Sequence, residues 1–402
     1  MFSKRFALRD KTVENRIVFQ PMEGFDCKEN GEPDVFTKRK YLRLAQGGAG
    51  ILWFEANAVC EEGRTNLRQM YLTEENADVF ARLLENVRET AVKECGFAPQ
   101  IFLQLTHSGR QSYRPTTMYR NEVYEARGRG GEILTDDYLD ALPEKYAHTT
   151  RLAQRVGFDG VDVKACHGYL LSESLSAFQR EGKYGGSFEN RTRLFLNCID
   201  AAKAALVGDT LLASRFGLSD MVAYPNGFAT DENGKADLTE TLMLLKKMQA
   251  SGIELLNITV GNPYYNPHVN RPYKKGGYIP PETPDVGLAR FHDLTAEVRR
   301  ANPTLAIVGS GFTYYAKDMM QKAGEALEEG ICDFVGFGRQ ILAYPDFYRD
   351  YQRGGVDPQK LCLTCSRCTE LMRAGCYAGC AIMDEPYRNL YKENIACKKQ
   401  HS

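Results

Sequence analysis

The chain has 402 residues, 43% of them hydrophobic, and a formal net charge of −1. This length and apolar content suffice for one large core with a small additional segment. Basic and acidic residues are spread along the chain, which disfavours a nucleic-acid-binding surface and a disordered acidic tail. No apolar run approaches the roughly 20 residues that span a bilayer, and the N-terminal segment does not resemble a secretory signal. We therefore expect a cytoplasmic protein without a membrane or nucleic-acid partner.

Eight short apolar runs that end in polar or glycine residues predict strands buried on both faces of a parallel sheet. They lie at residues 15–22, 51–57, 100–107, 160–166, 211–217, 255–261, 305–310 and 333–339. Amphipathic helical patterns alternate with them, and we predict Thr73 and Thr239 as N-caps. Eight strand–helix units predict a protein of the α/β class, a (β/α)8 barrel. A doubly wound sheet would need a glycine fingerprint after its first strand, and the residues after Met22 do not form one.

The barrel is predicted to occupy residues 1–350, followed by a cysteine-rich appendage at 351–385 and a polar tail at 386–402. Two long connections, 108–134 and 262–286, leave strands at their C-terminal ends, so we expect both to overhang the face where barrel enzymes carry their active sites. The second connection is rich in tyrosine. It is either a packed surface loop or a wall of a substrate pocket.

The most specific segment runs from Phe158 to Arg193. It carries a lysine, a histidine and a tyrosine at positions 164, 167 and 169, directly after an apolar strand pattern, and such proton-bearing side chains at a strand end are typical of barrel active sites. Its motifs K-A-C-H-G-Y-L-L and Y-G-G-S-F-E-N-R resemble those of the Old Yellow Enzyme-like flavin oxidoreductases. The family usually has histidine in place of Lys164 and alanine in place of Cys166. The resemblance covers about residues 5 to 385.

This resemblance implies that FMN lies across the C-terminal mouth of the barrel, in contact with residues at several strand ends. The first three strands would contribute Pro21, Met22, Glu23, Ala56 and Gln104. Arg215 would stabilise negative charge on the reduced flavin. The last two strands would hold the phosphate through Ser310, Gly311, Gly338 and Arg339. Glu23 stands where the family usually has threonine or cysteine, so its carboxylate either points away from the flavin or lowers the redox potential.

The resemblance also assigns catalytic roles. The family transfers hydride to an activated alkene while a proton reaches the neighbouring carbon. Lys164 and His167 occupy the positions of the donor pair that holds the substrate oxygen, and Tyr169 occupies that of the proton donor. Lys164 would suit an anionic oxygen. Alternatively, it pairs with a buried carboxylate such as Glu23 or Glu55, because a buried unpaired cation is costly.

Five of the twelve cysteines fall between Cys362 and Cys380, which favours a metal site over a disulfide framework. The spacing C-x2-C-x2-C-x11-C of Cys362, Cys365, Cys368 and Cys380 is similar to the [4Fe–4S] segment of a subgroup that includes dienoyl-CoA reductases, 2-enoate reductases and trimethylamine dehydrogenase, and it suits a cubane. A structural zinc ion is the alternative. Cys376 is able to replace Cys380, although the spacing favours Cys380.

We therefore interpret the chain as an FMN and [4Fe–4S] ene-reductase acting on an α,β-unsaturated carbonyl or carboxylate compound. Electrons would come from NAD(P)H or from a separate donor protein, because the chain ends before the FAD/NAD(P)H domain of the longer relatives, and we expect a homo-oligomer. The alternatives are an amine- or alcohol-oxidising flavoenzyme with non-covalent FMN and an electron-transfer subunit without catalysis. The complete set of Lys164, His167 and Tyr169 argues against the last.

Overall fold

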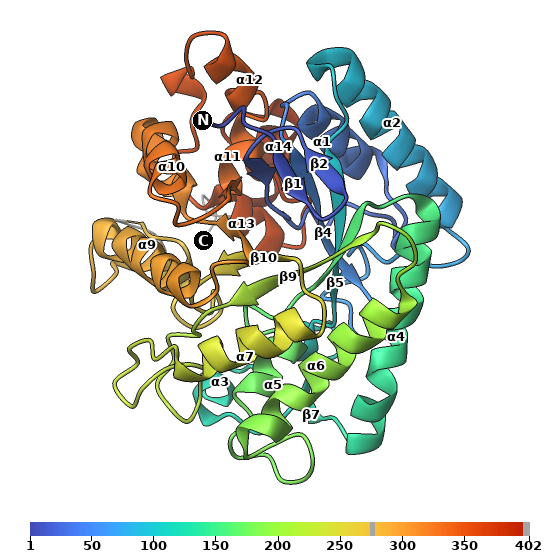
Figure 1. The fold of residues 1–402 in the computed structure, drawn as a ribbon, viewed down its shortest axis with the longest axis vertical. Helices are drawn as coiled ribbons and strands as arrows, with labels where there is room; N and C mark the ends of the chain where they lie inside the picture. Colours follow the sequence, from blue (N-terminus) through green and yellow to red (C-terminus); the bar gives the residue numbers. More distant parts are fainter. Residues whose placement is uncertain (274–277, 397–402) are drawn as a thin grey trace.

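A computed structural model describes residues 1–273 and 278–396. Eight parallel strands close into a barrel in the order β3, β4, β5, β8, β9, β10, β11, β12, with helices around it (Figure 1). The strands are β3 (Ile17–Phe19), β4 (Ile51–Ala58), β5 (Gln100–Thr106), β8 (Gly160–Val163), β9 (Leu211–Gly217), β10 (Leu255–Thr259), β11 (Ala306–Gly309) and β12 (Phe334–Phe337). Each predicted strand forms, and the (β/α)8 fold is confirmed.

The helices that follow the strands pack their apolar faces on the barrel. They are α1 (Val35–Ala45), α2 (Ala77–Cys95), α4 (Asp136–Val156), α6 (Phe188–Ala205), α7 (Thr239–Ala250), α9 (Pro284–Ala301), α10 (Met319–Glu328), α11 (Arg339–Ala343) and α12 (Phe347–Gln352). None of the described helices is long and apolar enough to cross a membrane.

Neither threonine that we predicted as an N-cap occupies that position. Helix α2 begins after Asn76, whose side-chain oxygen accepts a hydrogen bond from the Thr73 backbone N–H at 2.9 Å. Thr239 is the first residue of α7, and Asp237 accepts bonds from its backbone N–H and its hydroxyl. In both cases a nearby Asn or Asp oxygen competes for the local donors, as these short side chains do at turns.

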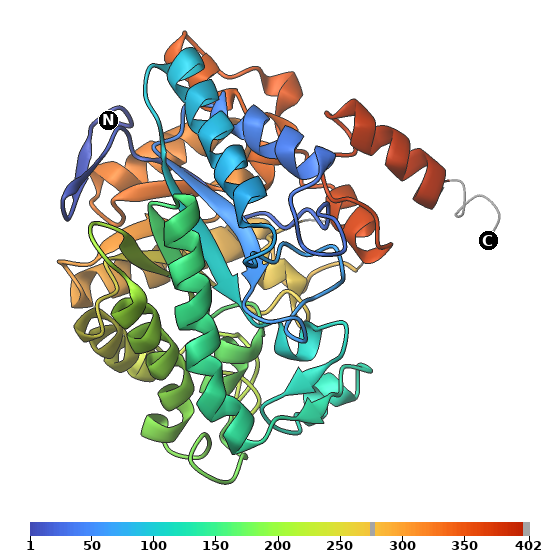
Figure 2. The ribbon, with the colours of Figure 1, turned by 90° about the vertical axis from the view of Figure 1, so that its right-hand side faces the viewer.

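The N-terminal end of the barrel is closed by the hairpin of β1 (Phe6–Leu8) and β2 (Lys11–Val13). Leu8 and Val13 share a buried apolar cluster with Trp53 and Phe102 from the barrel interior. This hairpin and the C-terminal helices lie on opposite sides of the molecule (Figure 2). A site on this fold is therefore accessible from the C-terminal strand ends.

Both long connections leave those strand ends. The first contains the short 3-10 helix η1 (Gly109–Gln111), helix α3 (Glu122–Glu125) and the paired strands β6 (Thr116–Thr117) and β7 (Glu132–Ile133). The second contains α8 (Pro267–Asn270).

The C-terminal segment contains η3 (Pro358–Lys360), α13 (Arg367–Arg373), α14 (Glu385–Tyr391) and η4 (Lys392–Ala396). It is tied to the barrel by Asp384, which pairs with Arg39 and Arg43 of α1. The predicted polar tail is helical as far as residue 396, and Tyr387 and Ile395 are buried against α13. The tail also carries Cys397, which lies outside the described residues.

A buried cation fixes the loop between β3 and α1. The Nζ atom of Lys40 lies 3.1 Å from an Asp26 carboxylate oxygen and also contacts a Glu55 carboxylate oxygen. The second Glu55 oxygen accepts the Gly24 backbone N–H at 2.6 Å. Burial by itself would lower the pKa of Lys40, but the two carboxylates outweigh it and raise that pKa well above its usual value. Lys40 therefore stays charged and holds helix, strand and loop together.

Replacing Lys40 with methionine should lower the free energy of unfolding by about 3–5 kcal/mol, because two carboxylates would remain buried without their shared cation. Urea denaturation followed by circular dichroism measures the loss. Lys38→Met on the same helix is the matched control, since Lys38 is only half-buried. Equal stability of the two variants would contradict this role for Lys40.

Candidate active site

A cavity of about 270 Å³ lies at the C-terminal strand ends. It brings together residues that are far apart in the sequence and that we predicted as site residues, namely Pro21, Met22, Glu23, Gln104, Lys164, His167, Tyr169, Arg215, Ser310, Gly311, Gly338 and Arg339. Ala56, which is fully buried within β4, is not among the lining residues. The strand ends thus deliver nearly all of the predicted site to one space.

Glu23 is the centre of the polar cluster on one wall. The Tyr169 hydroxyl donates to the two Glu23 carboxylate oxygens, at 3.0 and 3.2 Å. The Nζ atom of Lys164 lies 3.8 Å from Glu23 Oε1 and 3.5 Å from the centre of the Tyr169 ring. Of the two carboxylates considered as partners of Lys164, the structure selects Glu23, since Glu55 is held by Lys40.

Burial controls the protonation of this cluster. Burial and the Glu23 carboxylate raise the pKa of Tyr169 well above its usual value, so the phenol keeps its proton. Burial lowers the pKa of Lys164, although Glu23 opposes that shift. The Glu23 side chain is 16% exposed, compared with 3% for Lys164. Glu23 is therefore the member of the cluster with the better access to solvent.

His167 enters the cavity through an unusual turn. His167 and Gly168 both have positive φ, 65° and 68°, and a side chain at Gly168 would collide with the Asn262 amide. The His167 Nε2 atom lies 3.4 Å from the Thr259 hydroxyl and 3.3 Å from the Asn270 amide nitrogen. Burial and nearby cations lower its pKa well below the usual range. The imidazole is therefore neutral.

A buried carboxylate orients two further site residues. Asp162 on β8 accepts hydrogen bonds from the Gln104 side chain at 2.6 Å, the Trp53 indole at 3.0 Å and the Arg215 backbone N–H at 2.6 Å. The Arg215 guanidinium donates to the Pro21 carbonyl at 3.2 Å, and its Nε is buried without a partner among the described residues. Asp162 thus fixes the position of the Gln104 side chain and of the Arg215 backbone.

Two arginines crowd the end of the cavity next to the C-terminal segment. Arg339 donates to the Ser366 and Thr369 hydroxyls, at 3.1 and 2.9 Å, and Arg271 donates to the same Thr369 hydroxyl at 3.0 Å. Burial and the like charge of Arg339 lower the pKa of Arg271 to about 10. The Nε atom of Arg271 is buried without a partner among the described residues. This end is suited to an anion.

The four predicted metal ligands line a small cavity that shares Arg339 and Cys368 with the larger one. Cys362, Cys365, Cys368 and Cys380 all line it. Cys376, the alternative fourth ligand, does not, and its thiol points to a backbone carbonyl. Within residues 1–273 and 278–396, no group of three or more His, Cys, Asp or Glu side chains is arranged to hold a metal ion.

Several lining residues were not among the predicted site residues, because they come from the two long connections, where no strand pattern marks them. They are Arg129, Pro263, Tyr264, Asn270 and Arg271. The Tyr264 ring stacks beside Tyr169 with 6.5 Å between ring centres, and Arg129 lies over Tyr264, 4.8 Å from its centre. The second connection is therefore a wall of the pocket. Its aromatic composition was the only signal.

Residues 4–357 match the sequence profile of the NADH:flavin oxidoreductase / NADH oxidase family. The chain belongs to this family, and the enzyme is a flavin-dependent oxidoreductase of the Old Yellow Enzyme type with FMN as its cofactor. The NADPH dehydrogenase of Geobacillus sp. (strain WCH70) is 27% identical over 354 residues, which cover 86% of this chain and 92% of that protein.

Two solved structures share the fold. Morphinone reductase matches with a TM-score of 0.67 at 19% identity, over 90% of this chain and 92% of that one. A 2-naphthoyl-CoA reductase complex matches with a TM-score of 0.80 at 19% identity, over 96% of this chain but only 57% of that longer one. The unmatched part of this chain is much smaller than residues 358–402, which are more than a tenth of the sequence. The match therefore includes most of the cysteine segment.

His167 should stay neutral at pH 6, where an ordinary histidine with a pKa of about 6.5 is mostly protonated. A lowered pKa shifts protonation to a lower pH, so nitrogen NMR of histidine-labelled protein should show the neutral tautomer for this residue. His167→Gln identifies its signal by its loss. A His167 signal that titrates near pH 6.5 would contradict the burial and charge environment described here.

Proposed function

We propose that this enzyme is an ene-reductase that reduces the carbon–carbon double bond of an α,β-unsaturated carbonyl or carboxylate compound. The observation that supports this most directly is the buried Tyr169 side chain, whose hydroxyl keeps its proton and donates to Glu23 while the Lys164 ammonium lies over its ring. An alkene reduction needs one proton donor and one oxygen-binding group within a single pocket. This cluster contains both.

The cavity residues fit FMN, which when bound would supply the hydride. Arg271 and Arg339 place two like charges at one end, and a phosphate would neutralise them. Arg215 has a buried, unpartnered Nε that is available to an electron-rich ring edge. The absence of a side chain at Gly338 permits close approach of the cofactor to the backbone. A methyl group there would lie only 3.2 Å from the Met22 sulfur.

Lys164 and His167 would hold the substrate oxygen. The neutral imidazole is able to donate one hydrogen bond, and the lysine would leave its 3.8 Å contact with Glu23 for a nearer anionic oxygen. Removing water from the pocket strengthens both interactions as negative charge develops on that oxygen. Their role is electrostatic, and neither has to release a proton.

Tyr169 would deliver the proton, and Glu23 would return one to it. Once the phenol has given up its proton, the Lys164 ammonium beside its ring stabilises the phenolate. Glu23 is in hydrogen-bond contact with the same hydroxyl and is partly exposed, so it provides a route from solvent. Proton return to Tyr169 would be the role of the Glu23 carboxylate, which replaces the family's usual threonine or cysteine.

The four-cysteine segment would hold a [4Fe–4S] cluster. In a cubane each thiolate binds a different iron, so the four sulfurs surround a space instead of converging on one point. A structural zinc ion, which also accepts four cysteine thiolates, is the alternative. The NADPH dehydrogenase relatives support a nicotinamide electron donor. A donor protein and a homo-oligomer stay predictions.

Tyr169→Phe should slow reoxidation of the reduced flavin by an enone by about 10²–10⁴-fold, because general acid catalysis is lost. Reduction by NADPH should be nearly unchanged. Anaerobic stopped-flow absorbance separates the two half-reactions. The matched control is Tyr265→Phe, since Tyr265 lies on the neighbouring connection but does not line the cavity. Reoxidation of the Tyr169 variant at the parent rate would show that the proton comes from another group.

Anaerobically purified protein should contain about four iron and four sulfide per chain if the cysteine segment holds a cubane. Cys380→Ser should reduce both, whereas Cys376→Ser should leave them unchanged, because only Cys380 lines the cavity. Iron, zinc and labile sulfide are measured on the same sample. Stoichiometric zinc without sulfide would rule out the cluster.

A further inference from the structure

We propose that Arg129 is a carboxylate-binding residue that makes the enzyme selective for unsaturated carbonyl compounds bearing a second, anionic group. The inference rests on the proposed function and adds a substrate class to it. It places the reacting carbonyl at Lys164 and His167 and the carboxylate at Arg129, which lies over the Tyr264 ring.

The charge of the cavity is unbalanced. The described lining residues include one carboxylate, Glu23, and six basic side chains, namely Arg129, Lys164, Arg215, Arg271, Arg339 and Arg373. Glu23 is shared between Lys164 and Tyr169. A cavity with this excess of cations attracts anions and disfavours cationic amines. The same excess argues against the amine-oxidising alternative.

FMN would use the cations at one end for its phosphate and Arg215 for its ring. Arg271 and Arg339 meet at Thr369 of the C-terminal segment, where a phosphate would lie. Arg129 comes from the connection after β5 and contacts Tyr264, the neighbour of the catalytic tyrosine. The two groups of cations are thus carried by different elements. Arg129 is left for the substrate.

Arg129 has unused hydrogen-bonding capacity. One Nη atom donates to the Gln111 side chain, and the guanidinium carbon lies 4.8 Å from the centre of the Tyr264 ring. No described carboxylate forms an ion pair with Arg129, and the side chain is half-buried at the cavity wall. An arginine with free N–H groups beside an aromatic face binds planar carboxylates in a defined geometry.

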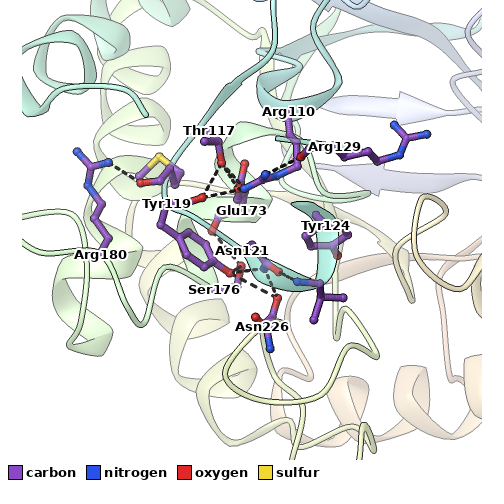
Figure 3. Close-up of polar contacts among 12 residues, drawn as sticks. Arg110, Thr117, Tyr119, Asn121, Tyr124, Arg129, Glu173, Ser176, Arg180 and Asn226 are labelled. Atoms are coloured by element: carbon purple, nitrogen blue, oxygen red, sulfur yellow. Dashed lines mark hydrogen bonds and ion pairs between the residues drawn. The ribbon is translucent and has the colours of Figure 1, made fainter. Parts of the chain in front are cut away.

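The loop that carries Arg129 is fixed by a buried polar network (Figure 3). The Arg110 guanidinium is paired with Glu173 of α5 (Leu170–Leu175) and donates to the Arg129 carbonyl at 2.7 Å. Thr117 also donates to Glu173, and the Arg129 backbone N–H donates to the Tyr124 carbonyl at 3.0 Å. The Arg129 side chain extends away from this cluster in Figure 3.

This network makes Arg129 a preorganised binding group. A rigid loop does not have to be ordered when substrate binds, so the charge-assisted bonds contribute to affinity. Without a ligand, the buried ion pair of Arg110 and Glu173 supports only the position of the loop. The free-energy cost of burying this ion pair is consistent with a loop that must hold the Arg129 side chain in a fixed position.

The test compares 4-oxo-2-pentenoate with its methyl ester as oxidants of the reduced enzyme in anaerobic stopped-flow measurements. The two compounds differ in charge but little in size, and the ester is the better electrophile. Because only the acid carries the charge that Arg129 is proposed to bind, the parent enzyme should be half-saturated by the acid at a much lower concentration than by the ester. Arg129→Gln should raise the half-saturating acid concentration by about 10- to 100-fold and change that of the ester little, whereas Arg129→Lys should recover part of the loss.

Arg127→Gln is the matched control. Arg127 lies on the same loop but is exposed, contacts Tyr265 and does not line the cavity. Its removal should leave both half-saturating concentrations unchanged. Equal effects of Arg129→Gln on acid and ester, with both still reduced, would overturn this inference alone. Failure of the parent enzyme to reduce either compound, or any member of a wider enone panel, would overturn the proposed function itself.

Discussion

The active site depends on the buried contact between Lys40 and the carboxylates of Asp26 and Glu55. Through its second oxygen, Glu55 holds the backbone N–H of Gly24, next to the Glu23 carboxylate that organises the catalytic cluster. The Gly24 carbonyl accepts a bond from Ala378 at 2.7 Å, so the same point also anchors the C-terminal segment. A side chain at Gly24 would collide with Asp26 and Lys40. One ion cluster thus positions both the catalytic loop and the cysteine segment.

Electrostatics gives the cavity its chemical character. Buried Asp162 and Glu55 lie beneath it and are satisfied by backbone and side-chain donors, while most of the charges that face the space are positive. The low dielectric of the cavity strengthens the attraction of these cations for negative charge. The result is a pocket that favours an anionic cofactor and electron-rich oxygens. Glu23 is the exception, and it contacts the residue that we assign as proton donor.

Much of the fold and site was predictable because parallel strands carry a local signal. Each buried strand is a short apolar run, and barrel closure brings the residues after all eight runs to one face. Lys164, His167 and Tyr169 stood out for this reason, whereas Gln104 and Arg215 were assigned by the resemblance to a flavin-oxidoreductase family. The helix starts at Thr73 and Thr239 were predicted wrongly, because side chains a few residues away competed for the same hydrogen bonds.

The sequence by itself determined the barrel, its flavin-oxidoreductase family and the residues at the strand ends, since these follow from local periodicity and contiguous motifs. Only the tertiary structure decided which charges meet. It paired Lys164 with Glu23 and Lys40 with Glu55, and it placed Arg129 beside Tyr264. Such pairings join residues from different segments of the chain, and no pattern within either segment records them.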